Sequence, residues 1–448
     1  MTDPGGDAAQ RSSTIEKSPT TTPRTRASWW PWAVAATAFV ALMGAAGFRS
    51  APGVLIAPLH DEFGWSTATI STAVSINLVL YGVFSPFAAA LMERFGMRRV
   101  VSVALLLVAA GSGLTVIMTQ VWQLMLFWGV LVGVGTGSMA LAFVATVTGR
   151  WFVKRRGLVS GVLTAAGAAG GLVFLPLMAS LSETLGWRAA SLLVAAGALV
   201  VVPVVLVFLR DDPRDVGTVA HGADPAARDD APPVTGGAGR RAVSVLVEAA
   251  RTRTFWLLAG GFAICGATTV GLLGTHFVPA AHDHGMPTTT AAGLLALVGV
   301  FDVVGTIASG WFTDRWDPRF LLAVYYGLRG ASLLVLPLLL APTTVPPMWA
   351  FIVFYGLDWV ATVPPTVALC RERFGARGPI VFGWVFASHQ VGAAFAAFGA
   401  GLVRDTTGSY DGAWWGAGAL CAIALVLSLM IRRSPTAPVA PAPRAVDR

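Results

Sequence analysis

The sequence predicts an all-α integral membrane protein whose twelve transmembrane helices form two six-helix, pseudo-symmetric halves. Three observations lead to this fold class: an apolar composition, twelve long hydrophobic runs, and a repeat of sequence features at a fixed offset. Of the 448 residues, 55% are hydrophobic and only 12% are charged. A soluble domain carries roughly 25% charged residues. So few charges cannot cover a water-exposed surface, and we expect the surrounding solvent to be a lipid bilayer.

Twelve apolar runs are each long enough to cross a bilayer, which takes about 20 residues. We expect each run to be a helix, because a helix satisfies its backbone hydrogen bonds internally where there is no water. The runs lie at residues 31–57, 69–92, 99–119, 122–149, 157–182, 187–209, 254–280, 290–312, 320–341, 347–370, 379–403 and 412–431.

The basic residues are divided unequally between the two sides of the membrane that these spans define. Of the 31 Lys and Arg residues, 27 fall on the side of both termini, whereas Arg188 and Arg404 fall on the other side and Arg49 and Arg329 lie within spans. Positively charged loops stay in the cytoplasm. We therefore expect a multi-pass protein of the plasma membrane with both termini cytoplasmic. The net charge of +8 comes from these short loop clusters, so it does not indicate nucleic-acid binding.

Several sequence features recur at an offset of 221 residues, which predicts that the two halves are copies of one six-span unit. Parallel halves of this kind are related by an axis along the membrane normal and hold their binding site near the midplane between them. The recurring features are Glu62–Ser71 with Asp283–Ala292, Glu93-Arg94 with Asp314-Arg315, Arg150 with Arg371, and Arg156-Gly157 with Arg377-Gly378.

The composition between and outside the spans predicts the organisation of the chain. Residues 1–28 and 433–448 are expected to be disordered cytoplasmic tails. Residues 29–209 and 254–432 are expected to be the two six-helix bundles. Residues 210–253 are expected to be a cytoplasmic linker, because they contain the flexible stretch HGADPAARDDAPPVTGGAG. A short amphipathic helix at the membrane surface is expected at the end of this linker, over Arg241–Arg253.

The loop between the second and third spans, ALMERFGMRR (Ala90–Arg99), resembles a motif of the major facilitator superfamily. The motif is Gly, three residues, Asp-Arg, one residue, Gly-Arg-Arg. Ala89, Glu93 and Met97 replace its first Gly, its Asp and one Arg, whereas the second copy, GWFTDRWDPR (Gly310–Arg319), keeps the Gly and the Asp-Arg. The resemblance extends from about residue 30 to 432 and implies the major facilitator fold.

The resemblance implies a gating or structural role for Glu93, Arg94, Asp314 and Arg315. In the family, these acid–arginine turns hold helix ends together at the cytoplasmic face and release them as the two halves rock. The alternative is that these residues only supply the positive charge of cytoplasmic loops.

Three stretches are similar to the monocarboxylate and oxalate–formate branch of the superfamily: Gly47–Ser71, Arg150–Gly171 and Asp211–Gly217. The similarity implies a secondary active transporter of a small organic anion, coupled to protons or working by exchange. The alternative is a proton-driven exporter of a drug or an amphipathic metabolite, although the fifth span, with GAAGG at Gly167–Gly171, lacks the proline-containing motif of drug–proton antiporters. A non-transporting membrane sensor is a third class.

No pattern in the sequence indicates an enzyme, a cofactor or a metal site. The glycine-rich Gly133–Gly137 lacks the Lys and Ser/Thr of a phosphate-binding loop, so transport is expected to use gradients. An isolated His-Asp-His at His282–His284 is a poor metal ligand set. Cys265, Cys370 and Cys421 lie in apolar runs and are expected to be small buried hydrophobes. The expected partners are the substrate, protons and lipid, and the expected functional unit is a monomer.

Arg49, in the first span, is the first candidate for substrate binding. The resemblance places it where monocarboxylate transporters carry a substrate-linked Lys, also followed by a Ser, here Ser50. The planar guanidinium matches a carboxylate with two hydrogen bonds. We therefore predict that Arg49 binds the anionic head of the substrate; the alternative is a structural ion pair with the seventh or eighth span.

Asp302, in the eighth span, matches an Asp of the same branch, but Thr306 stands where that branch has an Arg one turn on. We predict that Asp302 couples transport to protons, and the alternative is a permanent ion pair with an Arg. A second cationic anchor is then absent or supplied by Arg329. Arg329 and Asp358 lie on consecutive spans and are expected to pair with each other; the alternative is that Asp358 faces the cavity and contributes to substrate binding.

Four further polar residues are candidates for the substrate site. His276 and His389 could hydrogen-bond substrate or relay protons, and Asn77 and Tyr81 lie one helical turn apart in the second span. For the two histidines the alternative is a role in helix packing, and Asn77 could instead hydrogen-bond a neighbouring helix.

Overall fold

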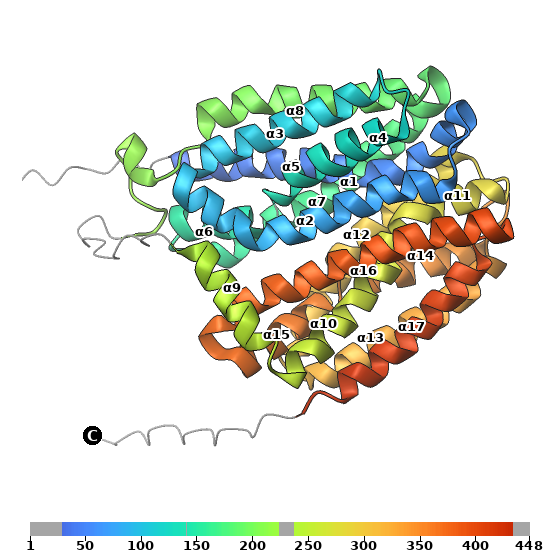
Figure 1. Ribbon diagram of the computed structural model, residues 1–448. Coiled ribbons are helices and arrows are strands. Elements are labelled where there is room, and N and C mark those ends of the chain that lie inside the picture. Colours follow the sequence, from blue (N-terminus) through green and yellow to red (C-terminus); the bar gives the residue numbers. More distant parts are fainter. Residues whose placement is uncertain (1–28, 140, 224–236, 433–448) are drawn as a thin grey trace, which may run out of the picture.

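The computed structural model describes residues 29–139, 141–223 and 237–432. Over these ranges the chain is almost entirely helical, with one isolated β-bridge between Phe152 and His221. The predicted tails fall outside the described residues, as does the middle of the predicted linker. Figure 1 shows two helical bundles side by side, and the described chain begins and ends on the same face of the molecule. We name this face the termini face and the other the opposite face.

The first bundle contains the helices of the N-terminal half. They are α1 (Trp30–Phe63), α2 (Thr67–Phe95), α3 (Met97–Thr115), α4 (Val121–Leu124), the π-helix η1 (Met125–Val132), α5 (Gly133–Gly137), α6 (Leu141–Trp151), α7 (Arg156–Leu185) and α8 (Trp187–Phe208).

The second bundle contains the helices of the C-terminal half. They are α10 (Arg253–Gly266), the π-helix η3 (Ala267–Leu273), α11 (Gly274–Asp283), α12 (Thr288–Thr313), α13 (Pro318–Val335), η4 (Leu336–Leu338), α14 (Pro346–Asp358), α15 (Val363–Phe374), η5 (Gly375–Arg377), α16 (Gly378–Thr407) and α17 (Asp411–Leu429). Between the halves lie η2 (Pro213–Val216) and α9 (Ala238–Ala249).

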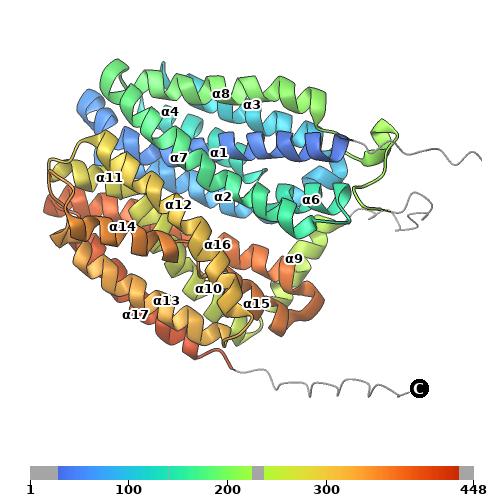
Figure 2. The ribbon, with the colours of Figure 1, turned by 180° about the vertical axis from the view of Figure 1, so that it is seen from behind.

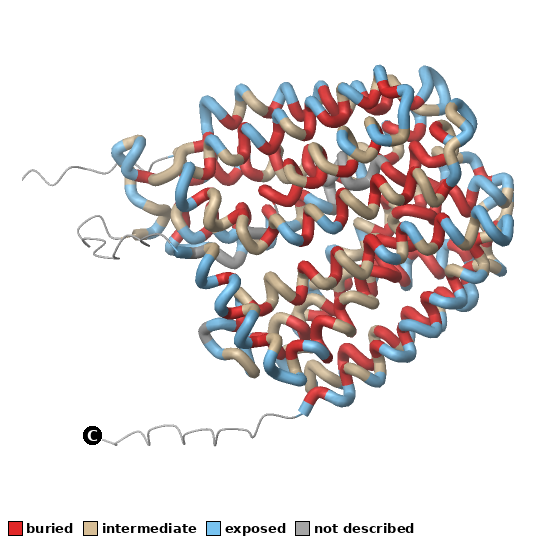
Figure 3. Tube along the Cα trace, viewed as in Figure 1, coloured by how far each residue is buried: buried red, intermediate tan, exposed pale blue. Residues whose placement is uncertain are grey.

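The predicted spans coincide with these helices, and the all-helical membrane fold is confirmed. Ten helices among the described residues are long and apolar enough to cross a membrane. The first and fourth spans are represented by the shorter apolar stretches Trp30–Ala45 and Val121–Gly137. The outward faces of the helices are apolar as well, for example at Ile307, Leu338 and Phe395, which are exposed by 70%, 81% and 74%. Exposed apolar side chains of this kind are suited to contact with lipid, and Figure 3 shows the buried residues concentrated where helices meet.

The two halves touch mainly along two helix pairs, and α1 also contacts α11 across them. Helix α2 packs against α16, and α7 packs against α12. Figure 1 shows the first pair from the front, and Figure 2, from behind, shows α12 next to α7. Each pair joins one helix of the N-terminal half to one of the C-terminal half, so relative motion of the halves must change these contacts.

The repeat in the sequence is reproduced by matching contacts at the termini face. Arg98, at the start of α3, donates a side-chain hydrogen bond to a carbonyl near the end of α8, and Arg319, one repeat later at the start of α13, donates to a carbonyl after α17 at 2.8 Å. An aspartate accepts the amide hydrogen of each arginine, Asp211 at 2.9 Å and Asp317 at 3.0 Å. A Cβ on Gly96, which has φ +83°, would lie 2.4 Å from Asp211 Oδ2, which explains the glycine of the motif.

These contacts differ from those expected of the acid–arginine turns. The side chains of Glu93 and Arg94 are exposed. The contacts described for Arg94 and Arg315 are local: Arg94 lies over the ring of Phe95, and Arg315 donates to the carbonyl of Trp311 at 3.0 Å. The contacts between helix ends are made by Arg98 and Arg319, so a gating role for Glu93, Arg94, Asp314 and Arg315 stays a prediction.

The predicted linker is held at both ends. The amide of His221 donates to the Trp151 carbonyl at 2.8 Å, and the Val153 amide donates to the His221 carbonyl at 2.9 Å. These bonds attach the first part of the linker to the end of α6 in the N-terminal half. The amphipathic helix is present as α9, a few residues before its predicted position, and the indole of Trp384 in α16 donates to the Ala242 carbonyl at 2.9 Å. Because α9 also packs on α2, it contacts both halves at the termini face.

Candidate functional site

Three spans lose regular α-helical geometry along part of their length. The fourth span contains η1, the seventh contains η3, and the tenth is interrupted by turns at residues 359–362 between α14 and α15. Irregular backbone at membrane depth is tolerated only where it is buried in protein or lines a cavity, and π-helical turns are frequent at functional sites. The interruption of the tenth span has a local cause, since Pro364 and Pro365 cannot donate backbone hydrogen bonds.

A buried arginine lies where the irregular parts of the seventh and tenth spans meet. Arg329, on α13, has no exposed surface. Its Nε donates to Asp358 Oδ2 at 2.5 Å and its Nη2 donates to the Asp358 carbonyl at 2.6 Å. Its Nη1 donates to Cys265 Sγ at 3.1 Å, and the ring centroids of Tyr326 and Tyr355 lie 5.9 Å from its Cζ. All three guanidinium nitrogens therefore have partners.

The Arg329–Asp358 pair expected from the sequence is thus present. A buried ion pair is tolerated when further hydrogen bonds satisfy the remaining donors and acceptors. Arg329 meets this condition, but Asp358 does not: its Oδ1 is buried and has no hydrogen-bond partner among the described residues. Because Arg329 is fully buried and each of its nitrogens already has a partner, it is not accessible to a substrate anion in this conformation.

Asp302, on α12, contacts the interrupted part of the tenth span. Its Oδ1 accepts hydrogen bonds from the Val360 amide and the Thr306 hydroxyl, both at 3.0 Å. The amide is available because the helix is broken there, two residues after Asp358. Arg329 is close enough to interact electrostatically with Asp302. Arg329 therefore contacts Asp358 directly and acts on Asp302 through its charge alone; Asp302 is partly exposed and Asp358 is buried.

The resemblance placed Thr306 where the family branch has an arginine, and the structure shows what the threonine does. It donates to Asp302 from one turn away on the same helix. A hydroxyl at this position satisfies the carboxylate without neutralising its charge. The only cation described near both carboxylates within residues 237–432 is Arg329, which comes from α13.

His276 is held inside the C-terminal half. Its side chain is fully buried; Nε2 lies 2.8 Å from the Ala397 carbonyl and Nδ1 lies 3.3 Å from the Tyr410 hydroxyl. The structure therefore favours the packing alternative for His276 over substrate binding. The ring of His389 lies between those of Phe386 and Phe262, with centroids 5.8 Å and 4.9 Å away, which also favours packing.

The two candidates on α2 lie at helix contacts. Asn77 Nδ2 donates to the Trp128 carbonyl in η1 at 3.0 Å, so it satisfies backbone at the irregular part of the fourth span. The ring of Tyr81 meets that of Phe386 on α16 edge-on, with centroids 6.0 Å apart. Asn77 thus acts as a helix–helix hydrogen bonder, and Tyr81 lies at the contact between the two halves.

Arg49 belongs to α1, but its side chain lies outside the described residues, so its role stays a prediction. The described part of α1 shows how close this helix comes to the seventh span. A Cβ on Gly53 would lie 3.2 Å from the Thr275 carbonyl. The first and seventh spans are therefore in backbone contact across the two halves.

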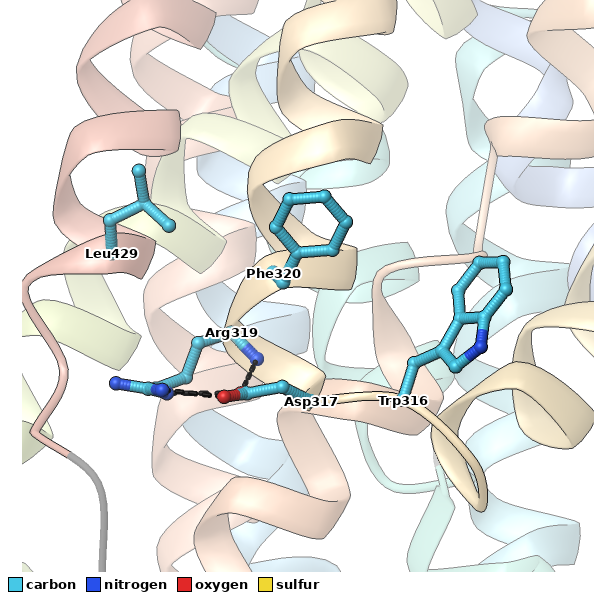
Figure 4. A pocket seen from close by; sticks show the side chains of 5 residues that line it. All are labelled: Trp316, Asp317, Arg319, Phe320 and Leu429. Atoms are coloured by element: carbon cyan, nitrogen blue, oxygen red, sulfur yellow. Dashed lines mark hydrogen bonds and ion pairs between the residues drawn. The ribbon is translucent and has the colours of Figure 1, made fainter.

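A large hollow on the surface is not part of this site. It has a volume of about 640 Å³ and lies at the termini face between α13 and α17, lined by Trp316, Asp317, Arg319, Phe320 and Leu429. Figure 4 shows the guanidinium of Arg319 beside the carboxylate of Asp317, with Phe320 above them and Trp316 on the far side of Asp317. Aromatic and arginine side chains are typical of the membrane interface. The hollow involves one half alone, so it does not line a path between the halves.

Sequence reasoning missed two features of the site. Cys265 was expected to be only a small hydrophobe, yet its sulfur accepts from Arg329 and lies 3.2 Å from the Thr362 hydroxyl. The sequence could have indicated this contact, because Cys265 is in the same half as Arg329 and an intramembrane Arg needs several partners. The break in the tenth span was also missed, although Pro364 and Pro365 indicate it.

Two charged pairs tie helix ends together at the opposite face. Glu62, at the end of α1, accepts from the Trp187 indole at 2.6 Å and from Arg188 Nη1 at 2.7 Å. These hydrogen bonds, that from Arg188 first, lower the pKa of Glu62 below its usual 4.5. In the other half, Arg404 Nε donates to Asp283 Oδ2 at 2.6 Å. Each of these pairs joins helices of the same half.

Comparisons with known proteins agree with the fold and the branch. The family model described as Major Facilitator Superfamily matches residues 37–379. The uncharacterized MFS-type transporter YcxA of Bacillus subtilis (strain 168) is 25% identical over 386 residues, which cover 85% of this chain and 90% of that protein. Monocarboxylate transporter 13 of Bos taurus is 29% identical over 403 residues, 87% of this chain and 86% of that protein.

Solved structures share the fold at low sequence identity. A bacterial homolog of the human lysosomal transporter Spinster, in an inward-facing and occupied conformation, aligns with a TM-score of 0.72 at 16% identity, covering 92% of this chain and 100% of that chain. A D-xylose-proton symporter aligns with a TM-score of 0.66 at 14% identity, covering 90% and 98%.

Proposed function

Because this chain belongs to the Major Facilitator Superfamily, we propose that it is a secondary active transporter that carries a small organic anion, of the monocarboxylate type, together with a proton. Transport proceeds by alternating access of a site between the two six-helix halves. The observation that carries the proposal is the cluster of Arg329, Asp358 and Asp302 beside the broken tenth span.

The charges of this cluster support proton coupling. One buried guanidinium faces two carboxylates, so the cluster carries a net negative charge when both carboxylates are ionised and is neutral when one holds a proton. A net charge inside the membrane is costly, which favours the protonated form while the cluster is closed to water. Asp302 is the proton carrier of the proposal, because it is partly exposed whereas Asp358 is engaged by Arg329.

The substrate class rests on Arg49 and on the relatives. Arg329 is fully buried and engaged by Asp358 in this conformation, so the cation that meets the substrate carboxylate must come from elsewhere, and Arg49 is the intramembrane arginine predicted for that purpose. A carboxylate gains two charge-assisted hydrogen bonds from such a side chain. Relatives that align over most of this chain are named monocarboxylate transporters, which supports the same class.

The orientation follows from the charges of the loops. The termini face carries most of the arginine residues, so we place it, with both termini, in the cytoplasm. The opposite face is then extracellular, and the membrane is the plasma membrane.

Uptake into proteoliposomes tests the proposal. A panel of labelled monocarboxylates is offered with and without an inward proton gradient, and the gradient is expected to drive accumulation of at least one acid. Asp302→Asn keeps a side-chain oxygen for the Val360 amide but cannot carry a proton. It is expected to abolish gradient-driven accumulation while exchange of substrate across the membrane continues. If Asp302→Asn accumulates the acid as the parent does, Asp302 does not couple the proton; if no acid is transported by well-folded protein, the substrate class is wrong.

A further inference from the structure

The first turn of α2 is capped by a residue from the other half. At the opposite face, the carboxylate of Asp405, at the end of α16, accepts the Thr67 amide at 3.0 Å and the Ala68 amide at 2.7 Å. The first amides of a helix have no partner within the helix, and a carboxylate there also interacts favourably with the helix dipole. Asp405 thus joins the C-terminal half to the N-terminal half.

The reciprocal contact exists one repeat later. The carboxylate of Glu183, at the end of α7, accepts the Thr289 amide at 3.0 Å in the first turn of α12. Thr289 lies 221 residues after Ala68, so the two capped turns are equivalent by the internal repeat. Each half therefore provides one carboxylate and one helix start, and the two contacts are related by the pseudo-symmetry of the fold.

The caps differ from the other polar contacts at this face. The Glu62–Arg188 and Asp283–Arg404 pairs join helices of the same half, so they move with it. The caps connect the halves along α2–α16 and α7–α12, the two helix pairs with the most extensive contact between the halves. Opening of this face requires both caps to separate.

The surroundings of the caps allow them to break and reform. The side chains of Asp405 and Glu183 are exposed, so water can replace the amide as a hydrogen-bond partner. A hollow of about 170 Å³ lies beside Glu183 between the halves, and its lining includes Asp61 and His282. Through this partly open hollow next to the cap, solvent and small solutes reach the contact between the two halves.

We propose that Asp405 and Glu183 are gate residues, which hold the opposite face closed by capping α2 and α12 and release these helices each time that face opens. The proposal rests on the alternating access described above. It assigns to the two carboxylates a role in the equilibrium between conformations and none in contact with substrate.

Distance measurements between spin labels test the gate without any substrate. Labels are attached at Thr119→Cys, between α3 and α4, and at Thr343→Cys, between η4 and α14. Both positions are exposed and belong to different halves at the opposite face. The native cysteines are buried, and labelling of the parent chain measures their background.

Asp405→Asn combined with Glu183→Gln is expected to raise the population with the longer label distance several-fold relative to the parent. Each single variant should give an intermediate shift. The matched control is Asp283→Asn, which removes a carboxylate from the same face but from a contact within one half, and it should leave the distance distribution unchanged. The melting temperature of each variant establishes that it is folded.

An unchanged distance distribution in the folded double variant would overturn the proposal, and so would an equal shift in Asp283→Asn. If the double variant does not fold and only a single variant can be measured, an unchanged label-distance distribution in that single variant would overturn the proposal. A shifted distribution without uptake of any monocarboxylate would uphold the gate while removing the proposed substrate class, so the two conclusions fail separately.

Discussion

The guanidinium of Arg329 and the carboxylate of Asp358 meet at 2.5 Å in the interior of the C-terminal half, where neither side chain has more than 7% of its surface exposed. The pair joins α13 to the last residue of α14, directly before the turns that interrupt the tenth span. Since α13 packs against α17 and away from the other half, Arg329 reaches the interior from the periphery of the bundle. It supplies the positive charge that the eighth span lacks at Thr306.

Removal of one partner of this pair should cost far more stability than removal of both. Arg329→Met leaves Asp358 buried and uncompensated, which is expected to lower the free energy of unfolding by about 3–5 kcal/mol. Arg329→Met with Asp358→Leu replaces the pair by apolar groups and should recover most of that loss. Thermal melting in detergent measures both variants. A double variant as unstable as the single one would show that the pair contributes more than charge balance.

The sulfur of Cys265 should matter as a hydrogen-bond acceptor. Cys265→Val preserves the apolar volume but removes the partner of Arg329 Nη1, and an unsatisfied buried donor costs about 1–3 kcal/mol. Cys265→Ser keeps an acceptor and should be the milder change. Melting temperatures of the two variants check the order, and Cys370→Val is a matched substitution at another buried cysteine of the same half. If Val and Ser at 265 are equally tolerated, the sulfur acts through packing alone.

The sequence predicted the membrane class and the spans, because hydropathy and positive charge directly reflect the bilayer. It predicted the repeat from features that recur at a fixed offset. It also brought Arg329 and Asp358 together, since an intramembrane charge requires a partner. It could not show that Asp302 accepts an amide from the tenth span, because that contact depends on how the span breaks at residues 359–362. It also missed Asp211 as the cap of α3, because that contact joins residues distant in the chain.

The candidate histidines show a second limit. A histidine in an apolar span has the same sequence appearance whether it faces a cavity or packs against a carbonyl, as His276 does against Ala397. Which of the two applies depends on helix rotation, and apolar faces towards lipid and towards protein are alike in composition. The sequence therefore predicts depth in the membrane better than the direction in which a side chain points.

Close approach of α12 to the tenth span positions Asp302, and it depends on Gly305. A Cβ at Gly305 would lie 1.8 Å from the Leu357 carbonyl, so Gly305→Ala must push the two helices apart. Overpacking of this kind costs about 1–3 kcal/mol, and the shift would weaken the contact of Asp302 with Val360. We expect both a lower melting temperature and reduced uptake.

The matched control lies on the same helix. A Cβ at Gly293 meets no atom within 4 Å, and Ala is a better helix former than Gly by about 1 kcal/mol. Gly293→Ala should therefore be neutral or slightly stabilising and should transport as the parent does. Equal effects of the two substitutions would mean that helix propensity, and not the contact with Leu357, determines the result.

Acidification should weaken the contact between α1 and α8 at the opposite face. Glu62 has a pKa below its usual 4.5 because Arg188 and Trp187 donate hydrogen bonds to its carboxylate. A carboxyl group whose pKa is lowered by folding stabilises the folded state above its ordinary pKa, and this contribution is lost as the pH falls through the lowered value. The parent should therefore melt at a higher temperature than Glu62→Gln at pH 7, and the difference should shrink steadily below about pH 4.5. A difference that persists unchanged at pH 3 would show that Glu62 stabilises the helix ends through neutral hydrogen bonds and packing, with no contribution from its charge.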